Sequence, residues 1–341
     1  MVPCAPRLAK PMRLLGCSKF VFTAIIRLWF AGLCLIGLGT TCSLLSAAEN
    51  RIDLQKTDHQ VTVLCDGQII AEYCFADPQV SHPYWRQFRT LSGIQLTRNH
   101  PPQEGSDATD HVGMHTGAWL AFGDISGNDY WRLKAKVQQK ELRIVPVEEA
   151  GTASFRVQND WLSQNNETVI LKEETQFRFR LLGEGYLLEW DTSLVAATGD
   201  VVFGEQEEMG LGLRVATPLA VDKKLGGRML DSAGRLNGKA IWGQTADWCD
   251  YSGPIAGGWG GITVLVDTRN GRQCRCHARD YGFLALNPFS TKVFTGGEPT
   301  PFKLDHGKNV RLRFGLYIHQ APSASGFSVL SAKSEFDSQK N

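Results

Sequence analysis

The chain has 341 residues, with 36 Lys and Arg, 35 Asp and Glu, and a formal net charge of +1. Residues 1–48 hold five of the bases and no acid, so the remainder carries 31 bases against 35 acids, a net charge of −4. This balance excludes the basic surface that nucleic-acid binding needs, and the remaining length suffices for one large core.

Residues 1–48 have the order of a secretory signal peptide. A basic start precedes an apolar run at 28–39 (LWFAGLCLIGLG), and Ser46-Ala47-Ala48 offers small residues for cleavage. The run is shorter than the about 20 residues that span a bilayer. We therefore predict an exported protein, periplasmic or secreted. The alternative is an uncleaved leader, which would be the protein's only membrane contact.

The first predicted strands form a hairpin. Val61, Val63 and Cys65 alternate with polar residues, Asp66-Gly67 follows, and alternation resumes from Ile69 to Phe75. An Asp-Gly pair between two alternating runs is typical of a tight hairpin turn.

Further strands are predicted along the rest of the chain. Apolar and charged side chains alternate in residues 168–182, which indicates a sheet with one wet face. No long segment after the leader shows a helical stripe. We predict an all-β fold, a large antiparallel β-sandwich, as one domain over 49–322 with a flexible tail over 323–341. The other predicted strands are 131–147, 211–217, 261–267 and 310–319.

The cysteines leave several alternatives open. Five follow the leader: Cys65, Cys74, Cys249, Cys274 and Cys276. An exported location permits disulfides, and an odd number leaves at least one thiol unpaired. A bridge across the hairpin, a metal at Cys274-x-Cys276 and simple buried thiols all fit the sequence.

Residues 111–131 (HVGMHTGAWLAFGDISGNDYW) favour a functional loop over a packing element. The segment is rich in glycine and places His111 and His115 four residues apart. Glycine lets a backbone approach a ligand closely, and histidine titrates near neutral pH. Acid/base or ligand contact, structural histidines and a metal site remain alternatives; the glycines argue against a helical zinc motif.

Two more glycine-rich regions carry polar side chains that are unusual in strands. Residues 205–214 contain Glu208 and Arg214, and residues 242–287 end on a turn at Asn287. In a strand, His277 and Arg279 would share a face, whereas Asp280 would face the other way. Each group has an alternative structural role as a salt bridge, a solvated turn or a turn-former.

Five blocks in this order resemble a family of exported bacterial proteins of unknown function, called PmoA-like or methane oxygenase-like. The family's usual first motif, His-Pro-His-His-Arg-Gly, is incomplete at His111 to Gly117. The resemblance implies a fold similar to the galactose mutarotase-like β-supersandwich, whose enzymes use a His acid and a carboxylate base on sugars. The blocks are residues 84–102, 110–131, 210–216, 242–253 and 277–289.

Together, the sequence and the resemblance predict a carbohydrate-active or carbohydrate-binding protein. If it is an enzyme, an isomerase or lyase reaction is expected, with no cofactor and no metal. The alternatives are a non-catalytic glycan-binding module and a metal-dependent hydrolase that uses Asp110, His111 and His115. Predicted acid/base residues are His111, His115, Glu208, His277 and Asp280. Predicted substrate contacts are Arg98, Trp119, Arg214, Trp242, Arg279 and Asn287.

Overall fold

The computed structural model describes residues 51–147, 149–270 and 272–339. The predicted signal peptide lies outside these residues. Among them, none of the helices has the length and apolar character needed to cross a membrane.

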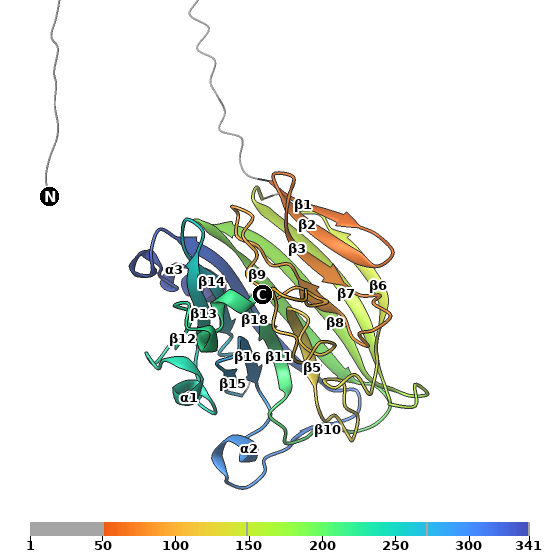
Figure 1. The fold of residues 1–341 in the computed structure, drawn as a ribbon. Coiled ribbons are helices and arrows are strands. Elements are labelled where there is room, and N and C mark those ends of the chain that lie inside the picture. Colours follow the sequence, from red (N-terminus) through yellow and green to blue (C-terminus); the bar gives the residue numbers. More distant parts are fainter. Residues whose placement is uncertain (1–50, 148, 271, 340–341) are drawn as a thin grey trace, which may run out of the picture. The chain divides into compact units, whose positions relative to one another are not determined.

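Two eight-stranded antiparallel sheets build the described chain and confirm the all-β prediction (Figure 1). The order in the first sheet is β1 (Ile52–Lys56), β2 (Gln60–Cys65), β3 (Gln68–Cys74), β4 (Tyr84–Arg86), β5 (Ala118–Phe122), β11 (Met209–Arg214), β16 (Phe283–Asn287), β15 (Arg275–Arg279). The order in the second is β12 (Arg228–Asp231), β13 (Trp248–Ile255), β14 (Gly258–Val266), β18 (Asn309–Ala321), β9 (Gly185–Ala196), β8 (Val169–Leu182), β7 (Thr152–Leu162), β6 (Val137–Val145). A small separate pair joins β10 (Val201–Phe203) and β17 (Phe302–Leu304).

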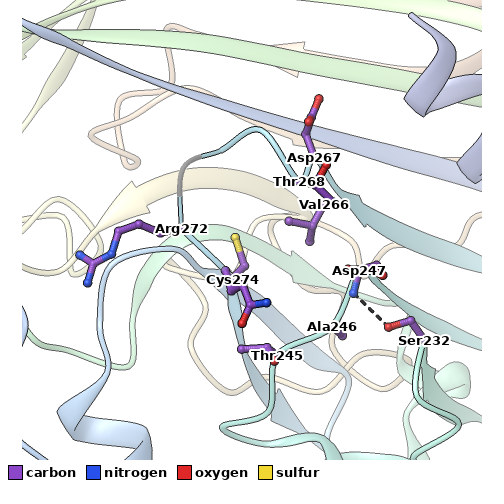
Figure 2. Close-up of a pocket in the computed structure, with 10 residues that line it drawn as sticks. Ser232, Thr245, Ala246, Asp247, Val266, Asp267, Thr268, Arg272 and Cys274 are labelled. Atoms are coloured by element: carbon purple, nitrogen blue, oxygen red, sulfur yellow. Dashed lines mark hydrogen bonds between the residues drawn. The ribbon is translucent and has the colours of Figure 1, made fainter.

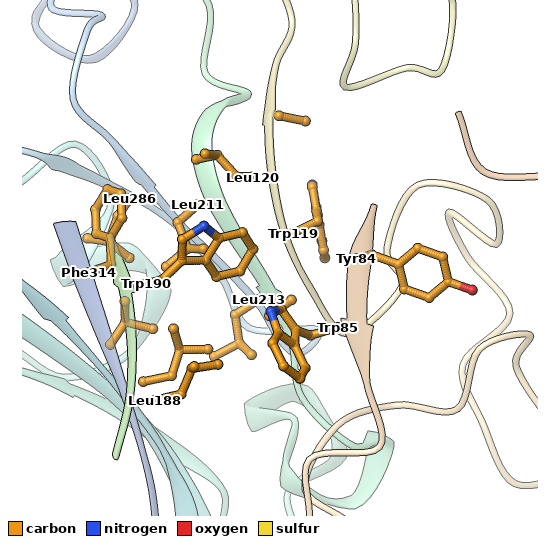
Figure 3. Close-up of a cluster of buried hydrophobic side chains, with 14 of the residues drawn as sticks. Tyr84, Trp85, Trp119, Leu120, Leu188, Trp190, Leu211, Leu213, Leu286 and Phe314 are labelled. Atoms are coloured by element: carbon orange, nitrogen blue, oxygen red, sulfur yellow. The ribbon is translucent and has the colours of Figure 1, made fainter. Parts of the chain in front are cut away.

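The core lies between the two sheets. Tyr73 of β3 packs on Phe177 of β8 with ring centroids 5.0 Å apart, and Trp85 of β4 meets the same ring at 5.1 Å. Figure 3 shows another part of this core, where Trp85 and Trp190 come from opposite sheets. Burial of apolar surface is the main favourable contribution to folding, and large aromatic side chains supply much of that surface.

The predicted hairpin is confirmed. Asp66 and Gly67 both have positive φ, at 48° and 80°, which matches the two-residue turn expected for Asp-Gly. Cys65 pairs with Gln68 and Cys74 with Gln60, so the two thiols lie at opposite ends of the hairpin. Both are unbridged, and the three other cysteines among the described residues are buried thiols.

The alternation over 168–182 is also confirmed, because β8 buries one face and exposes the other. The predicted strand at 131–147 begins later than expected, since β6 starts at Val137 after a series of turns. The missed strands include β13, β15 and β16, which are almost wholly buried and therefore show little alternation.

The C-terminal stretch differs from the frayed tail that its small polar residues predict. Leu330–Ser338 forms α3, and its Phe336 is fully buried. The guanidinium of Arg313 lies 3.9 Å over the Phe336 ring and donates to its backbone carbonyl at 3.0 Å. Tertiary contact thus orders a segment whose own helical pattern is weak. The other helices are α1 (Asn237–Ile241), α2 (Lys292–Thr295) and three short 3-10 turns.

Candidate functional site

The candidate site draws its residues from four neighbouring strands of the first sheet and from the segments next to them. β5, β11, β16 and β15 are adjacent in that sheet, although they are far apart in the sequence. The segment before β5 carries His111 and His115, and the loop before β11 carries Glu208. β15 contributes His277.

These four residues line one small cavity of about 140 Å³. Three imidazoles and a carboxylate therefore face a common space, as expected of a site for proton transfer. The lining residues are His111, Met114, His115, Trp131, Arg132, Glu208, His277, Tyr281 and Phe283.

Glu207 connects the β15 side chains. Its Oε2 lies 2.8 Å from Nη2 of Arg279 and 3.0 Å from Nε2 of His277. Burial raises the pKa of Glu207, since the opposing effect of Arg279 is offset in part by Glu208. Burial, with a smaller effect of Arg279, lowers the pKa of His277 to about 3, so this imidazole is neutral at pH 7.

Glu208 is paired with Arg132 on the cavity wall. Nη2 of Arg132 donates to Oε2 of Glu208 at 2.7 Å, and Nη1 donates to the side-chain oxygen of Gln206 at 2.9 Å. Arg132 also lies 3.4 Å from the carboxylate of Asp129. The guanidinium is thus shared between acceptors of two segments, Asp129 after β5 and the loop before β11.

Arg98 holds the loop that carries the two histidines. It is 1% exposed, and it donates to the carbonyls of Asp110 at 2.6 Å and of His115 at 2.8 Å. It also donates to the carbonyl of Ala108 at 2.9 Å. His111 has a left-handed φ of 50°, a conformation that such surrounding contacts must maintain. Arg98 therefore positions the loop, whereas its prediction as a substrate contact has no support from this geometry.

The histidine rings form a stack that leads from the surface into the core. His111 and His115 are 4.5 Å apart with an interplanar angle of 10°, and His115 lies 4.7 Å from the Phe283 ring at 11°. His115 also stacks on Trp119 at 5.2 Å. Burial, reinforced by Arg214, lowers the pKa of His115 well below its usual range.

Other predicted residues lie behind or beside the cavity. Trp119 is fully buried in the core, and Trp242 packs against Phe294 with ring centroids 5.4 Å apart. Asp280 follows β15 and accepts a hydrogen bond from the Gly238 backbone at 2.7 Å. Asn287 ends β16 and accepts the backbone N–H groups of the next turn, as predicted for a turn-former.

The sequence prediction missed Arg132 and Tyr281, and it preferred Glu208 to the adjacent Glu207 as the possible base. Arg132 directly follows the glycine-rich segment, and Tyr281 directly follows Asp280. Glu207 precedes the chosen Glu208, and a one-residue choice between adjacent acids depends on loop geometry that the sequence does not reveal. The one sequence signal that could have identified them is the position of polar residues beside glycine-rich turns.

One group that could hold a metal contains Asp110, His111 and His115, whose ligand atoms lie within 4.8 Å of one another. However, both oxygens of Asp110 accept hydrogen bonds from Arg214, at 2.8 Å and 2.7 Å. Arg214 is also 3.2 Å from Nδ1 of His115. A divalent cation here would displace or face a guanidinium, so these residues fit a metal poorly.

A second such group contains Glu207, Glu208 and His277, again within 4.8 Å of one another. Arg279 and Arg132 each neutralise one of its carboxylates. The donor set suits a metal, but the two guanidinium charges already serve the role that the metal would have.

A larger cavity of about 380 Å³ lies elsewhere in the chain, lined by residues that include Asp247, Asp267 and Cys274 (Figure 2). Nη1 of Arg313 donates to Oδ2 of Asp267 at 2.7 Å, so this carboxylate is already paired. Burial raises the pKa of the Cys274 thiol. A buried neutral thiol and a paired carboxylate are poor catalytic groups. This larger cavity is therefore a weaker candidate than the smaller one.

The chain belongs to a family of unknown function, DUF6807, whose model matches residues 60–326. That description names no methane oxygenase, so the PmoA-like resemblance stays a prediction. No curated protein matches the chain.

Several solved structures are similar to the chain at low identity. One is a galactose mutarotase-like protein from Lactobacillus casei, with 7% identity, a TM-score of 0.38, and coverage of 79% of this chain and 100% of that one. Another is a GalM/aldose epimerase homologue from C. elegans, with 7% identity, a TM-score of 0.32, and coverage of 80% and 99%. A polysaccharide lyase matches with 9% identity, a TM-score of 0.32, and coverage of 81% and 33%.

Proposed function

We propose that this protein is an exported carbohydrate-active enzyme that binds one sugar ring and moves protons on it, as an isomerase or lyase does. The observation that carries the proposal is the common cavity of His111, His115, His277 and Glu208. Proton transfer needs one group that accepts a proton and another that supplies one, both within reach of the substrate.

The side chains around the cavity supply both kinds of group. Glu207 is the candidate acid, because burial raises the pKa of this carboxyl group next to His277. Candidate bases are Glu208, which the sequence predicted, and the half-exposed His111. His277 and His115 stay neutral, because burial lowers the pKa of each.

The size and walls of the cavity support a single ring as ligand. Its volume of about 140 Å³ lies below the roughly 300–1,000 Å³ of pockets for drug-sized ligands. The half-buried Tyr281 supplies aromatic surface beside the polar groups, a combination that suits the C–H face and the hydroxyls of a sugar.

The glycan-binding alternative requires exposed tryptophan faces at the site. Trp119 is fully buried and Trp131 is 2% exposed, so neither offers an open platform. This burial favours the enzyme over the binding module.

Turnover of reducing monosaccharides and uronic-acid sugars by the full chain tests the proposal. Exchange NMR detects ring opening or epimerisation, and ultraviolet absorbance detects the double bond that elimination creates. We expect at least one substrate, whose turnover falls by about 100-fold or more in a His115→Gln/His277→Gln double variant.

The matched control is His59→Gln, at an exposed histidine in the turn between β1 and β2. It should leave turnover unchanged. Turnover that survives the double substitution would contradict the proposed site. Sugar binding without turnover would contradict the enzyme proposal and favour a glycan-binding module.

A further inference from the structure

Two stacked imidazoles at the cavity share a single ion pair. Oδ2 of Asp110 accepts from Nη1 of Arg214 at 2.8 Å and lies 2.8 Å from Nδ1 of His111. The same Nη1 of Arg214 lies 3.2 Å from Nδ1 of His115. The four side chains thus form one continuous chain of polar contacts, with a histidine at each end.

The chemistry of the ion pair decides where each ring carries its hydrogen. A guanidinium has only donors, so Nδ1 of His115 must accept from Arg214, and the hydrogen of that ring is on Nε2. An ionised carboxylate has only acceptors, so Nδ1 of His111 must donate to Asp110. Neutral His111 then has its lone pair on Nε2.

The charges nearby keep Asp110 ionised. Burial alone would raise the pKa of this carboxyl group, but hydrogen bonds from Arg214 and His111, and the charges of Arg214 and Arg98, lower it well below its usual range. Arg98 is itself buried, with Nη1 3.7 Å from Oδ1 of Asp110.

We propose that the Asp110–Arg214 ion pair fixes His111 and His115 in opposite tautomers, so that at the cavity His111 accepts and His115 donates through Nε2. Both rings line the cavity, and Nε2 of neither has a hydrogen-bond partner among the described residues. Stacked rings 4.5 Å apart would then present an acceptor beside a donor.

This arrangement selects a ligand with two neighbouring oxygens, one of them a hydroxyl. The hydroxyl donates to His111, and the second oxygen accepts from His115, as a vicinal diol or a hemiacetal centre would allow. This ligand class rests on the proposed function, whereas the tautomers follow from the ion pair alone.

The two histidines have different roles in proton transfer. When His111 acts as base, the substrate O–H bond breaks, an Nε2–H bond forms, and the electron pair stays on the oxygen. Asp110 then faces the resulting imidazolium and stabilises it. His115 remains a neutral donor that polarises the second oxygen. Glu208, already paired with Arg132, is the weaker base candidate.

Imidazole tautomers are measured directly by long-range ¹H–¹⁵N correlation spectra of the ¹⁵N-labelled full chain near neutral pH. Spectra of His111→Gln and His115→Gln variants assign the two rings. We expect hydrogen on Nδ1 in His111 and on Nε2 in His115, whereas the exposed His59 should show rapid averaging of both tautomers. The opposite tautomer in either ring, or averaging in both, would overturn the proposal.

Substitutions of the ion pair test its role as the cause. Arg214→Lys keeps an obligatory donor, so His115 should keep its hydrogen on Nε2. Arg214→Gln can also accept, so His115 should become a mixture of tautomers. An unchanged His115 spectrum in a folded Arg214→Gln variant would show that another group sets the tautomer. Should that variant fail to fold, the spectrum of the unmodified protein still decides the tautomers.

None of these readouts uses a sugar or a turnover rate, so they separate the two ideas. Fixed opposite tautomers without any sugar turnover would retain the inference and reject the proposed function. Sugar turnover by a protein whose two histidines have the opposite tautomers would retain the proposed function and reject the inference.

Discussion

Nδ2 of Asn287 donates a hydrogen bond to the backbone carbonyl of Glu207 at 3.1 Å, although the two residues are 80 positions apart. The same amide group donates to the carbonyl of Gln206 at 2.7 Å, and its oxygen accepts the N–H groups of Phe289 and Ser290. Asn287 is fully buried. One side chain thus ties the end of β16 to the loop that carries the acidic residues of the site.

We predict that Asn287→Ala destabilises the protein by about 3 kcal/mol, because several buried backbone groups lose their partner. Chemical denaturation measures the loss. The control is Asn309→Ala, where an exposed amide donates only to Ser193, and a change below about 0.5 kcal/mol is expected. Equal effects at both positions would contradict the role given to Asn287.

Gly212 of β11 leaves room for the tryptophans behind the cavity. A Cβ atom at this position would lie 2.5 Å from the Trp119 ring and 2.9 Å from Trp131. Gly212→Ala should therefore cost about 2–3 kcal/mol through overpacking. Gly199→Ala, with nothing within 4 Å of the added atom, should be neutral or slightly stabilising. Equal stability of the two variants in thermal unfolding would contradict the close packing of Gly212 against the tryptophans.

Acid should destabilise the fold through buried histidines. Burial lowers the pKa of His82 to about 4, and that of His277 to about 3. Because these folded-state values lie below the about 6.5 of an unfolded histidine, the stability is complete above about pH 6.5 and is lost as the pH falls toward 4. Each group should contribute about 1.4 kcal/mol per pH unit in that window.

His82→Gln checks this pH dependence away from the cavity. Its free energy of unfolding should fall less steeply than that of the unmodified protein between pH 6.5 and 4.5, by about 1.4 kcal/mol per unit. His59→Gln, at an exposed position, should leave the slope unchanged. Parallel curves for all three proteins would mean that His82 is not buried as a neutral group.

Glu208 should influence the ionisation of its neighbour Glu207. Its negative charge raises the pKa of Glu207, in addition to the larger effect of burial. Glu208→Gln removes that charge, so the pKa of Glu207 should fall, as measured by ¹³C NMR titration of carboxyl groups. The exposed Glu104→Gln is the control and should have no effect. A Glu207 pKa that does not change in Glu208→Gln would show that the two carboxylates do not interact.

The sequence predicted those features that depend on local pattern. The hairpin at Asp66-Gly67 and the half-wet strand over 168–182 were predicted correctly, because turn chemistry and alternation are local. The helix in the C-terminal segment was not predicted, because the burial of Phe336 depends on Arg313 of a distant strand.

At the site, the sequence indicated which residue types carry chemistry but not how they pair. His111, His115, Glu208 and His277 do share one cavity. The guanidinium of Arg98, however, donates its hydrogen bonds to backbone carbonyls of the loop and not to the cavity. Such assignments depend on contacts between segments far apart in the chain, which a single sequence does not encode in any local pattern.

Thermal unfolding of the full chain with a panel of monosaccharides tests the central claim most directly. A sugar at 100 times its Kd should stabilise the protein by about 2.7 kcal/mol. We predict such a shift for at least one monosaccharide, and its loss in Met114→Trp, where a larger side chain fills the cavity. The account would be contradicted if no monosaccharide raised Tm, or if Met114→Trp kept the full shift.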